Sequence, residues 1–475
     1  MKAHWQPILI MQMRSTHSFT SLHRSASIIF LVLFIGSPSL AEESYSTSGR
    51  LDLWGVAARN SDSVKEEPGL TGRIKIDTAQ SMWRFHSWLE GGWDGTVMRP
   101  ARDKKLFKNY DEVYQSNTPY LEFKELYVSH TADDLDVRAG IQRFAWGRLD
   151  EFPPNDLLNP WDYTQFLIKP LEDRKIGVPS VSATTNRGDF TYDAVWIPVF
   201  IPYRLPMPDE RWTGSSFAST ISRSIPGAEI VPREPDLPDH TVENSTLGIR
   251  IKRVGDIEWA LNLFHGYDPR PVFRTTALLI VPQGGNVLID QGYVPDFHRI
   301  SVIGLDAAAV RGGLSIRVEA AYNFNRYLNI RRELWGYPSV PSPGIYPLNP
   351  IEQKHDTLDY GIGADYRTFE DGLLTIQAQQ TIIFGNVDEL YERKVETLLW
   401  ANFKIGWLNR KMETNLNIAY NPEHGDTMAK ASAWYVFTDS WKAGAMVIGL
   451  NGPSQSIFGR YARNDQVEGE LVYSW

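Results

Sequence analysis

The sequence predicts an all-β fold: a transmembrane antiparallel β-barrel of 16–18 strands whose third extracellular loop folds into the lumen. Three observations carry this prediction. The last strand ends on an aromatic residue, apolar residues occupy every second position in many segments, and the connections alternate between short turns and long loops. In a membrane barrel one face of each strand meets lipid and the other meets water, which accounts for all three observations together.

Residues 1–41 are predicted to be an export signal, and residues 42–475 are predicted to form the barrel. Arg14 and Arg24 precede an apolar run over residues 28–35, and small residues follow it before Glu42. That run is too short to cross a bilayer as a helix, which takes about 20 residues. The predicted location is the bacterial outer membrane, where strands rather than helices cross the lipid.

Composition and charge exclude several classes of protein. Removing residues 1–41 leaves 45 of the 48 basic residues against 57 acidic ones, a formal charge of −12. Nucleic acid is not an expected partner, because binding it needs a concentrated basic face. The chain has no cysteine, which excludes a disulfide framework, a thiol nucleophile and a cysteine-based metal site. No metal or other cofactor is expected.

The strand ending the chain is residues 466–475. Val467, Leu471 and Tyr473 share one face with Trp475, while the residues between them are mostly polar. Segment 314–325 shows the same alternation most clearly, with six apolar residues at its even positions. Such a period of two is hard to obtain by chance in a helix or a loop. Similar patterns occur at 247–251, 257–263, 358–366, 397–407 and 412–420.

The connections predict which rim of the barrel each strand end reaches. Short polar turns are predicted at 78–81, 131–134, 186–189, 254–256, 311–313, 370–372, 409–411 and 438–440. Longer segments separate them, at 94–118, 147–174, 200–242, 267–297 and 326–354. Short turns on the periplasmic side and long loops outside are typical of bacterial barrels. Counting from about Ser48 gives eighteen strands, nine outside loops and eight inside turns, with sixteen strands as the alternative.

If the apolar residues face lipid, their neighbours line the lumen. Arg84, Arg138 and Arg317 are among the predicted lumen residues. A dry, plugged interior would pair such charges with one another, whereas a wet lumen can hydrate them. Because both signs are present, the sequence predicts neither strong anion nor strong cation selectivity.

The segment 141–163 is the one most suited to carry function. Strand alternation stops near Trp146, and the following residues are too apolar for a loop in water. The segment is therefore predicted to fold against the inner wall as the third outside loop and to constrict the pore, where charges act most strongly on a solute. The predicted constriction residues are Arg143, Trp146, Arg148, Asp150, Asp156, Asp162 and Arg174. Asn155-Asp156 as a helix N-cap and Asn159-Pro160 as a turn are the structural alternatives.

This segment resembles the motif of an uncharacterised family of proteobacterial outer-membrane barrels, known only as a domain of unknown function. The matching residues are Gly140, Gln142, Trp146, Gly147, Asp150, Asp156, Leu158, Asn159, Pro160 and Asp162. A proline-rich segment at 196–206 is also similar to that family's. The resemblance implies a porin-like channel, often suspected of passing hydrophobic or lipid-derived compounds, and it supplies no established substrate.

The predicted function is passive passage of a small solute, with hydrophobic and amphipathic compounds among the candidates. No catalytic residues are predicted, because none of the His residues of the mature chain lies in a metalloprotease or nucleophile-elbow motif. Two alternatives stay open: a barrel that sheathes a partner or exports a polysaccharide, and a hydrolase with a dyad assembled across strands. Expected partners are outer-membrane lipid, the small-molecule solute and the barrel-assembly machinery through the C-terminal strand, and a homo-oligomer is also considered.

Overall fold

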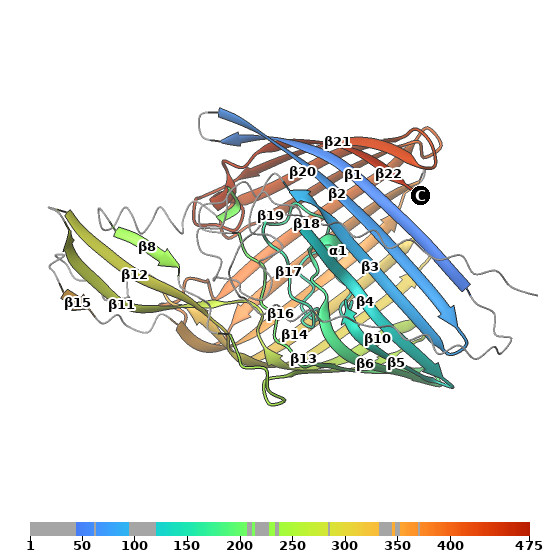
Figure 1. Ribbon diagram of the computed structural model, residues 1–475, viewed down its shortest axis with the longest axis horizontal. Helices are drawn as coiled ribbons and strands as arrows, with labels where there is room; N and C mark the ends of the chain where they lie inside the picture. Colours follow the sequence, from blue (N-terminus) through green and yellow to red (C-terminus); the bar gives the residue numbers. More distant parts are fainter. Residues whose placement is uncertain are drawn as a thin grey trace, which may run out of the picture. The chain divides into compact units, whose positions relative to one another are not determined.

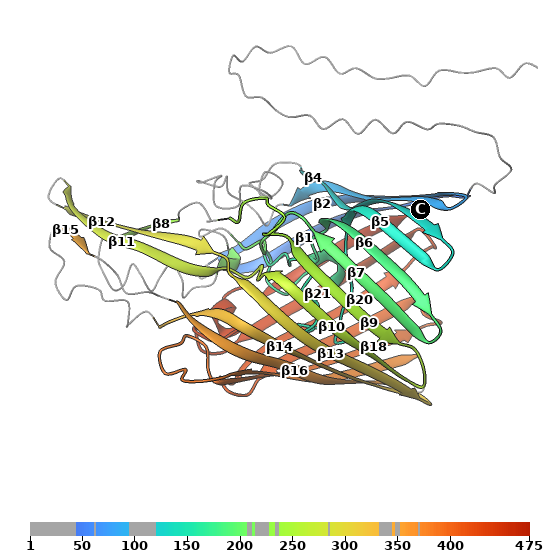
Figure 2. The same ribbon diagram turned by 90° about the horizontal axis from the view of Figure 1, so that it is seen from below.

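The computed structural model describes residues 44–60, 63–94, 120–206, 211–213, 228–232, 237–283, 286–331, 344–346, 352–368 and 371–475. Within these ranges, eighteen strands form one closed antiparallel barrel, which confirms the predicted fold class. Figures 1 and 2 show the tilted strands side by side around the teal segment that follows β5. The predicted export signal lies outside the described residues.

The strands of the barrel are β1 (Ser44–Asn60), β2 (Ser63–Gln80), β3 (Trp83–Asp94), β4 (Tyr120–Ala132), β5 (Leu135–Gln142), β6 (Val178–Arg187), β7 (Phe190–Ile197), β9 (Thr246–Arg253), β10 (Ile257–Tyr267), β13 (Arg299–Arg311), β14 (Leu314–Asn329), β16 (Glu352–Arg367), β17 (Gly372–Ile383), β18 (Val395–Trp407), β19 (Met412–Asn421), β20 (Asp426–Val436), β21 (Trp441–Asn451) and β22 (Gln466–Ser474). Helical segments are short: α1 (Leu171–Arg174), η2 (Arg211–Thr213) and η4 (Gly459–Tyr461). Among the described residues, no helix has the length and apolar character needed to cross a membrane.

The barrel closes where the first strand meets the last. β1 pairs with β22 in antiparallel register, with Leu53 opposite Leu471. Beyond the last strand, the backbone N–H and C=O of Trp475 both hydrogen-bond to Gly49, each at 3.1 Å. The aromatic C-terminus therefore completes the seam, and closure leaves neither of these two strands with an unpaired edge.

The predicted period of two appears as two different faces of the wall. Apolar residues at alternate positions are exposed on the outside, among them Leu51, Leu53, Leu247, Ile249, Ile303, Leu305, Ile316, Val318, Ile362, Ile376, Leu416 and Ile418. Their polar neighbours, such as Glu319 and Gln377, are buried inside. The exposed apolar residues face lipid, and the buried polar residues face the lumen and the loop enclosed in it, as in an outer-membrane barrel.

Turn lengths also follow the prediction. Tight connections such as Gly188-Asp189 and Gly312-Gly313 join strand pairs at one rim, and the longer connections lie at the other. Both described chain ends are on the rim of the short turns, because Ser44 pairs with Ala79 beside the β2–β3 turn and Trp475 with Gly49. The predicted loop 94–118 falls outside the described residues, except for Asp94.

A second, four-stranded sheet was not predicted. It consists of β8 (Ala228–Pro232), β11 (Val272–Gln283), β12 (Asn286–Asp296) and β15 (Gly344–Tyr346), in the order β15-β11-β12-β8. β11 and β12 form a hairpin inside the segment 267–297, which was predicted to be a long loop. The apolar run 277–281 followed by Gly284-Gly285 is a hairpin signal that was missed. The sheet joins three long loops, because β8, the hairpin and β15 come from different connections.

Candidate functional site

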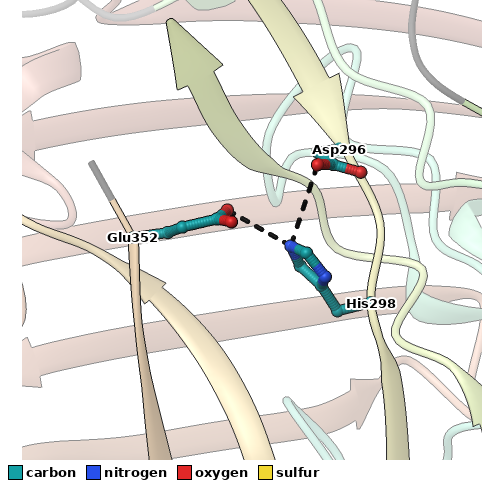
Figure 3. Close-up of side chains that lie close together, drawn as sticks. All are labelled: Asp296, His298 and Glu352. Atoms are coloured by element: carbon teal, nitrogen blue, oxygen red, sulfur yellow. Dashed lines mark hydrogen bonds and ion pairs between the residues drawn. The ribbon is translucent and has the colours of Figure 1, made fainter. Parts of the chain in front are cut away.

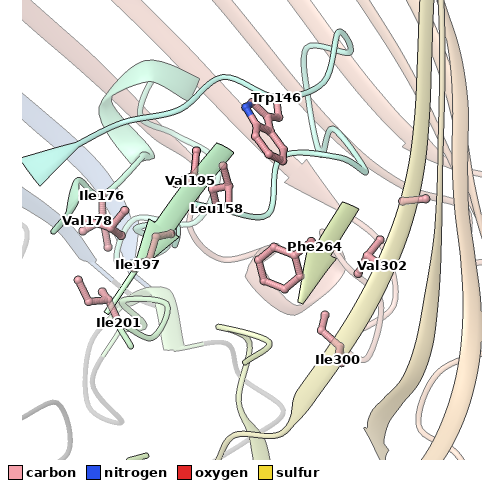
Figure 4. Packing of buried hydrophobic residues seen from close by; sticks show 11 residues of the cluster. Trp146, Leu158, Ile176, Val178, Val195, Ile197, Ile201, Phe264, Ile300 and Val302 are labelled. Carbon is pink, nitrogen blue, oxygen red and sulfur yellow. The ribbon is translucent and has the colours of Figure 1, made fainter. Parts of the chain in front are cut away.

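The connection between β5 and β6, residues 143–177, bridges the lumen, as predicted. We call it the bridging loop. One half packs on a first apolar cluster against β7, β10 and β13 (Figure 4). The cluster consists of Trp146, Leu158, Ile176, Val178, Val195, Ile197, Ile201, Phe264, Ile300, Val302 and Ala321. The cluster members on the barrel strands are apolar inward positions, contrary to the expected polar lumen, because they contact the loop rather than water.

The other half of the bridging loop reaches a different part of the wall. Leu167 and Ile168 belong to a second apolar cluster with Trp212, Leu398, Trp400, Ala419, Met428, Ile448, Leu450 and Phe458. Most of these wall residues come from β18 to β21. In addition, Lys430 of β20 donates a hydrogen bond to the backbone oxygen of Leu167 at 3.0 Å. The loop is therefore held at two separate stretches of the barrel wall.

Between these clusters, a single carboxylate of β14 holds the loop backbone. Glu319 accepts hydrogen bonds from the backbone N–H groups of Arg148, Leu149 and Asn155, at 2.8, 3.1 and 2.6 Å. Its residue exposure is 3%. Three donors that converge on one buried carboxyl group form the main polar anchor of this part of the loop, because each of these backbone N–H groups would otherwise be buried without a partner.

Amide side chains of β17 continue this attachment. Gln377 accepts a hydrogen bond from the backbone N–H of Asp150 at 2.9 Å and donates one to the backbone oxygen of Glu151 at 2.9 Å. Gln379 donates to the backbone oxygen of Phe152 at 2.8 Å. The backbone of the loop tip, residues 150–152, is thus hydrogen-bonded to side chains of the wall at three consecutive positions.

Gly147 is required where the loop leaves its strand. Its φ is +100°, in the region that favours glycine. A Cβ built there would also lie 2.6 Å from an oxygen of Glu319. The Trp-Gly pair of the motif therefore combines an apolar anchor, Trp146, with a backbone bend that brings the chain onto the Glu319 carboxylate.

Asn159 ties together the two ends of the bridging loop. Its amide accepts a hydrogen bond from the N–H of Phe144 at 2.6 Å and donates to the backbone oxygens of Gln142 and Ile176, at 3.0 and 2.8 Å. This supports the structural interpretation of the Asn-Pro pair. The predicted N-cap at Asn155-Asp156 is wrong, because no helix follows it and Asn155 instead bonds the wall at Leu305.

A buried ion pair joins the bridging loop to the proline-rich segment. Asp162 lies 3.3 Å from Arg204 and 3.9 Å from Lys169, and Arg204 also lies 3.1 Å from Glu122 of β4. Burial favours the neutral acid, but Lys169 and Arg204 outweigh it and lower the pKa of Asp162 from its ordinary value. The carboxylate is therefore a charged structural group rather than a free constriction charge.

We expect Arg204→Met to destabilise the folded barrel by about 1.5–3 kcal/mol, because Asp162 and Glu122 both lose a hydrogen bond from this cation. Each keeps a second cation, Lys169 and Lys124 respectively. Urea unfolding of the purified barrel in detergent measures the change. Arg410→Met is the matched control, since Arg410 pairs with Asp371 on the surface, and little change is expected there. Equal stability of the two variants would contradict a structural role for the Arg204 pair.

The proline-rich segment packs on its neighbours. β7 ends at Ile197, directly before the first proline of the segment, Pro198. Phe200 contacts the rings of Tyr267 and Phe297, with centroid distances of 5.5 and 4.9 Å. The apolar side chains of this segment are thus used in packing on its neighbours.

A polar cavity of about 450 Å³ lies between the bridging loop and the wall. Its lining includes the basic residues Arg138, Arg143, Arg148, Arg250 and Lys252 and only two carboxylates, Glu125 and Asp193. Two further carboxylates pair with the basic lining residues. Asp306 lies 3.2 Å from Arg250. Glu258 lies 3.0 Å from Arg148 and 3.5 Å from Lys252. Asp306 and Glu258 do not line the cavity, so the surface facing it is mainly basic.

The predicted site residues separate into three groups and one isolated residue, Arg84. Arg138, Arg143, Trp146 and Arg148 line the cavity. Asp156, Asp162 and Arg174 are buried and paired with Lys175, Arg204 and Glu151. Asp150 and Arg317 bond each other at 2.7 Å and hold the loop to β14. Arg84 is exposed at the start of β3 and is not among the cavity residues.

Several residues that hold the bridging loop in place or line the cavity were not identified as site residues from the sequence. Lys175 and Arg204 hold the buried carboxylates of the bridging loop, and Glu319 and Arg250 were predicted only as ordinary wall residues. Nothing local in the sequence identifies these residues, because most of the partners lie on distant strands or loops; Asp156, 19 residues from Lys175 within the bridging loop, is the exception. A weak signal existed at Val195-Trp196-Ile197, where both faces of the strand are apolar and the alternation fails.

Comparisons with known proteins agree with this architecture. A family profile described as "Protein of unknown function (DUF1302)" matches residues 58–400. Among solved structures, OccAB4 of Acinetobacter baumannii superposes with a TM-score of 0.50 at 8% identity, covering 91% of this chain and 98% of that chain. This likeness concerns the fold alone.

Two further solved structures are similar over the same share of this chain, 91%. OccAB1 of Acinetobacter baumannii has a TM-score of 0.49 at 8% identity and is covered to 95%. OccK8 (OprE) of Pseudomonas aeruginosa has a TM-score of 0.47 at 12% identity and is covered to 97%. No curated protein matches the chain in sequence.

Proposed function

We propose that this chain, which belongs to the DUF1302 family of proteins of unknown function, is a porin-like channel through which a small, water-soluble anion diffuses across the outer membrane. The observation that carries the proposal is the basic cavity beside the bridging loop. In this proposal the chain transports its solute without catalysing a reaction, in keeping with a porin-like barrel.

The charge on the cavity surface supports an anionic solute. Selectivity in a pore follows the groups that line its narrow part, where water is scarce and fields are strong. The carboxylates behind the lining reduce the field, so a moderate anion preference is expected rather than exclusion of cations.

The hydrophobic and amphipathic solutes considered from the sequence have less support. The apolar side chains of the bridging loop and of the proline-rich segment contact one another and the wall. A sheath for a partner is also less favoured, because a polypeptide in the lumen would have to displace a loop held at Glu319 and at Lys430.

Planar bilayer recordings of the purified protein test the proposal. Discrete conductance steps are expected, with a reversal potential displaced toward that of chloride in a KCl gradient. Membranes that remain silent after insertion has been verified would overturn the channel function. Conductance with a clear cation preference would keep the channel and reject the anionic solute.

We expect the double variant Arg138→Glu/Lys252→Glu to convert anion preference into cation preference, because two charges on the cavity surface change sign and its net charge falls by four units. The reversal potential in the same gradient measures this. Lys404→Glu is the matched control, since Lys404 faces inward but does not line the cavity. An unchanged reversal potential in the double variant would show that ions do not pass this cavity.

A further inference from the structure

A second cluster of polar side chains lies apart from the cavity, where β12, β13 and β16 begin or end (Figure 3). Asp296 is the last residue of β12, His298 directly precedes β13, and Glu352 is the first residue of β16. One atom of the His298 ring, Nε2, lies 3.2 Å from an oxygen of Glu352 and 3.9 Å from an oxygen of Asp296. The two carboxylates thus converge on the same nitrogen.

We propose that Asp296, His298 and Glu352 bind a divalent transition-metal ion, with Zn²⁺ as the best fit. Zinc bonds of about 2.0–2.2 Å in tetrahedral geometry place neighbouring ligand atoms roughly 3.4 Å apart. The two distances from His298 lie on either side of that value, and all three ligand atoms lie within 4.8 Å of one another. Only a small closing movement of the two carboxylates is needed.

The surroundings hold these ligands in position. The His298 ring stacks on Tyr327 with a centroid distance of 3.7 Å and an angle of 16°. The backbone N–H of Phe297 donates to one oxygen of Asp296 at 2.9 Å, which leaves the other oxygen for the ion. Contacts of this kind orient ligands and raise metal affinity. Arg274, 3.4 Å from Asp296, competes with the ion and moderates the affinity.

The donor set indicates the class of metal. One imidazole and two carboxylates suit Zn²⁺ and similar ions, whereas Ca²⁺ takes six to eight oxygen ligands. Three protein ligands leave a fourth position for water or an exogenous group. A bound ion would also fasten the base of the β11–β12 hairpin to the first residue of β16, two segments that are 54 residues apart at His298 and Glu352.

A comparison within the barrel shows why this cluster differs from an ordinary histidine ion pair. His86 also contacts two carboxylates, but Asp77 lies 2.6 Å from its Nδ1 atom and Glu125 lies 3.5 Å from Nε2. Opposite sides of one ring cannot serve a single ion. His86 therefore supplies a matched control with similar chemistry and the wrong geometry.

Isothermal titration of the folded, detergent-solubilised barrel with Zn²⁺ tests the proposal, and Co²⁺ serves as a spectroscopic probe. One ion per chain and the visible bands of four-coordinate Co²⁺ are expected. His298→Ala and Glu352→Gln should each weaken binding more than about tenfold, while His86→Ala should leave it unchanged. All variants are first checked for the folded barrel by heat-dependent gel mobility.

Equal Zn²⁺ affinity in the wild type and in folded His298→Ala would overturn the proposal, as would loss of binding in His86→Ala alone. Channel activity plays no part in these measurements, so the metal site and the proposed function can fail independently.

Discussion

Replacing Glu319 with alanine is expected to release the tip of the bridging loop from the wall and to raise single-channel conductance severalfold. The variant removes the acceptor of three backbone N–H groups, those of Arg148, Leu149 and Asn155. Water can hydrate the freed donors, so the barrel itself should stay folded while the loop loses its main polar anchor.

A cysteine probe can follow the same release directly. The natural chain has no cysteine, and Leu149 is buried against the wall with 5% exposure. Leu149→Cys should therefore react slowly with a thiol reagent in an otherwise unchanged barrel and quickly in the Glu319→Ala background. Glu413→Ala is the control, because it also removes a carboxylate of the barrel wall, but one that pairs with Lys404 of β18. Slow labelling and unchanged conductance in Glu319→Ala would refute its anchoring role.

Gly304→Val should dislodge the loop at a second point and produce an effect of similar size. Gly304 faces inward on β13, and a Cβ built there would lie 1.6 Å from the side-chain oxygen of Asn155. Asn155 is 2% exposed and also donates to the backbone oxygen of Leu305 at 3.1 Å. Since valine adds two further carbons, Asn155 must leave the wall and take the adjoining backbone with it.

The matched control for Gly304→Val is Gly469→Val. Gly469 lies on the outward face of β22, where a Cβ meets nothing within 4 Å. Both variants introduce the same residue into a strand, so a shared effect on folding yield cancels in the comparison. Conductance and the labelling rate of Leu149→Cys should rise in Gly304→Val only. If both variants behave like the wild type, the close approach of Asn155 to the wall does not govern the pore.

The fold could be predicted from the sequence because a membrane barrel repeats one local rule. Lipid on one side and a polar lumen on the other impose a period of two on each strand, and segment 314–325 shows it without interruption. The same rule predicts an even number of strands, an inward third loop and a last strand that ends at Trp475 and closes the barrel. The β11–β12 hairpin was missed because it lies beyond the lipid, where that rule does not apply.

The candidate site could be predicted only in part. The family motif identifies residues 141–163 as a candidate site, and the many apolar residues of this segment predict that it folds into the lumen. The sequence did not reveal that Asp156 and Asp162 serve as buried anchors. Arg204, the partner of Asp162, is 42 residues away in the proline-rich segment, and Lys175, the partner of Asp156, lies in the same loop but 19 residues away. Pairings across the lumen depend on which strands face each other, and this information is distributed over the whole barrel.

The bridge across the lumen also sets the order in which the barrel can be assembled. The bridging loop follows the fifth strand, yet Leu167 receives its hydrogen bond from Lys430, 263 residues later. This long-range contact cannot form until the C-terminal hairpins have curved round to meet it. Until that moment Leu167 and Ile168 lack most of their partners in the second cluster, which come from β18 to β21. This half of the bridging loop therefore docks late, when most of the strands are in place.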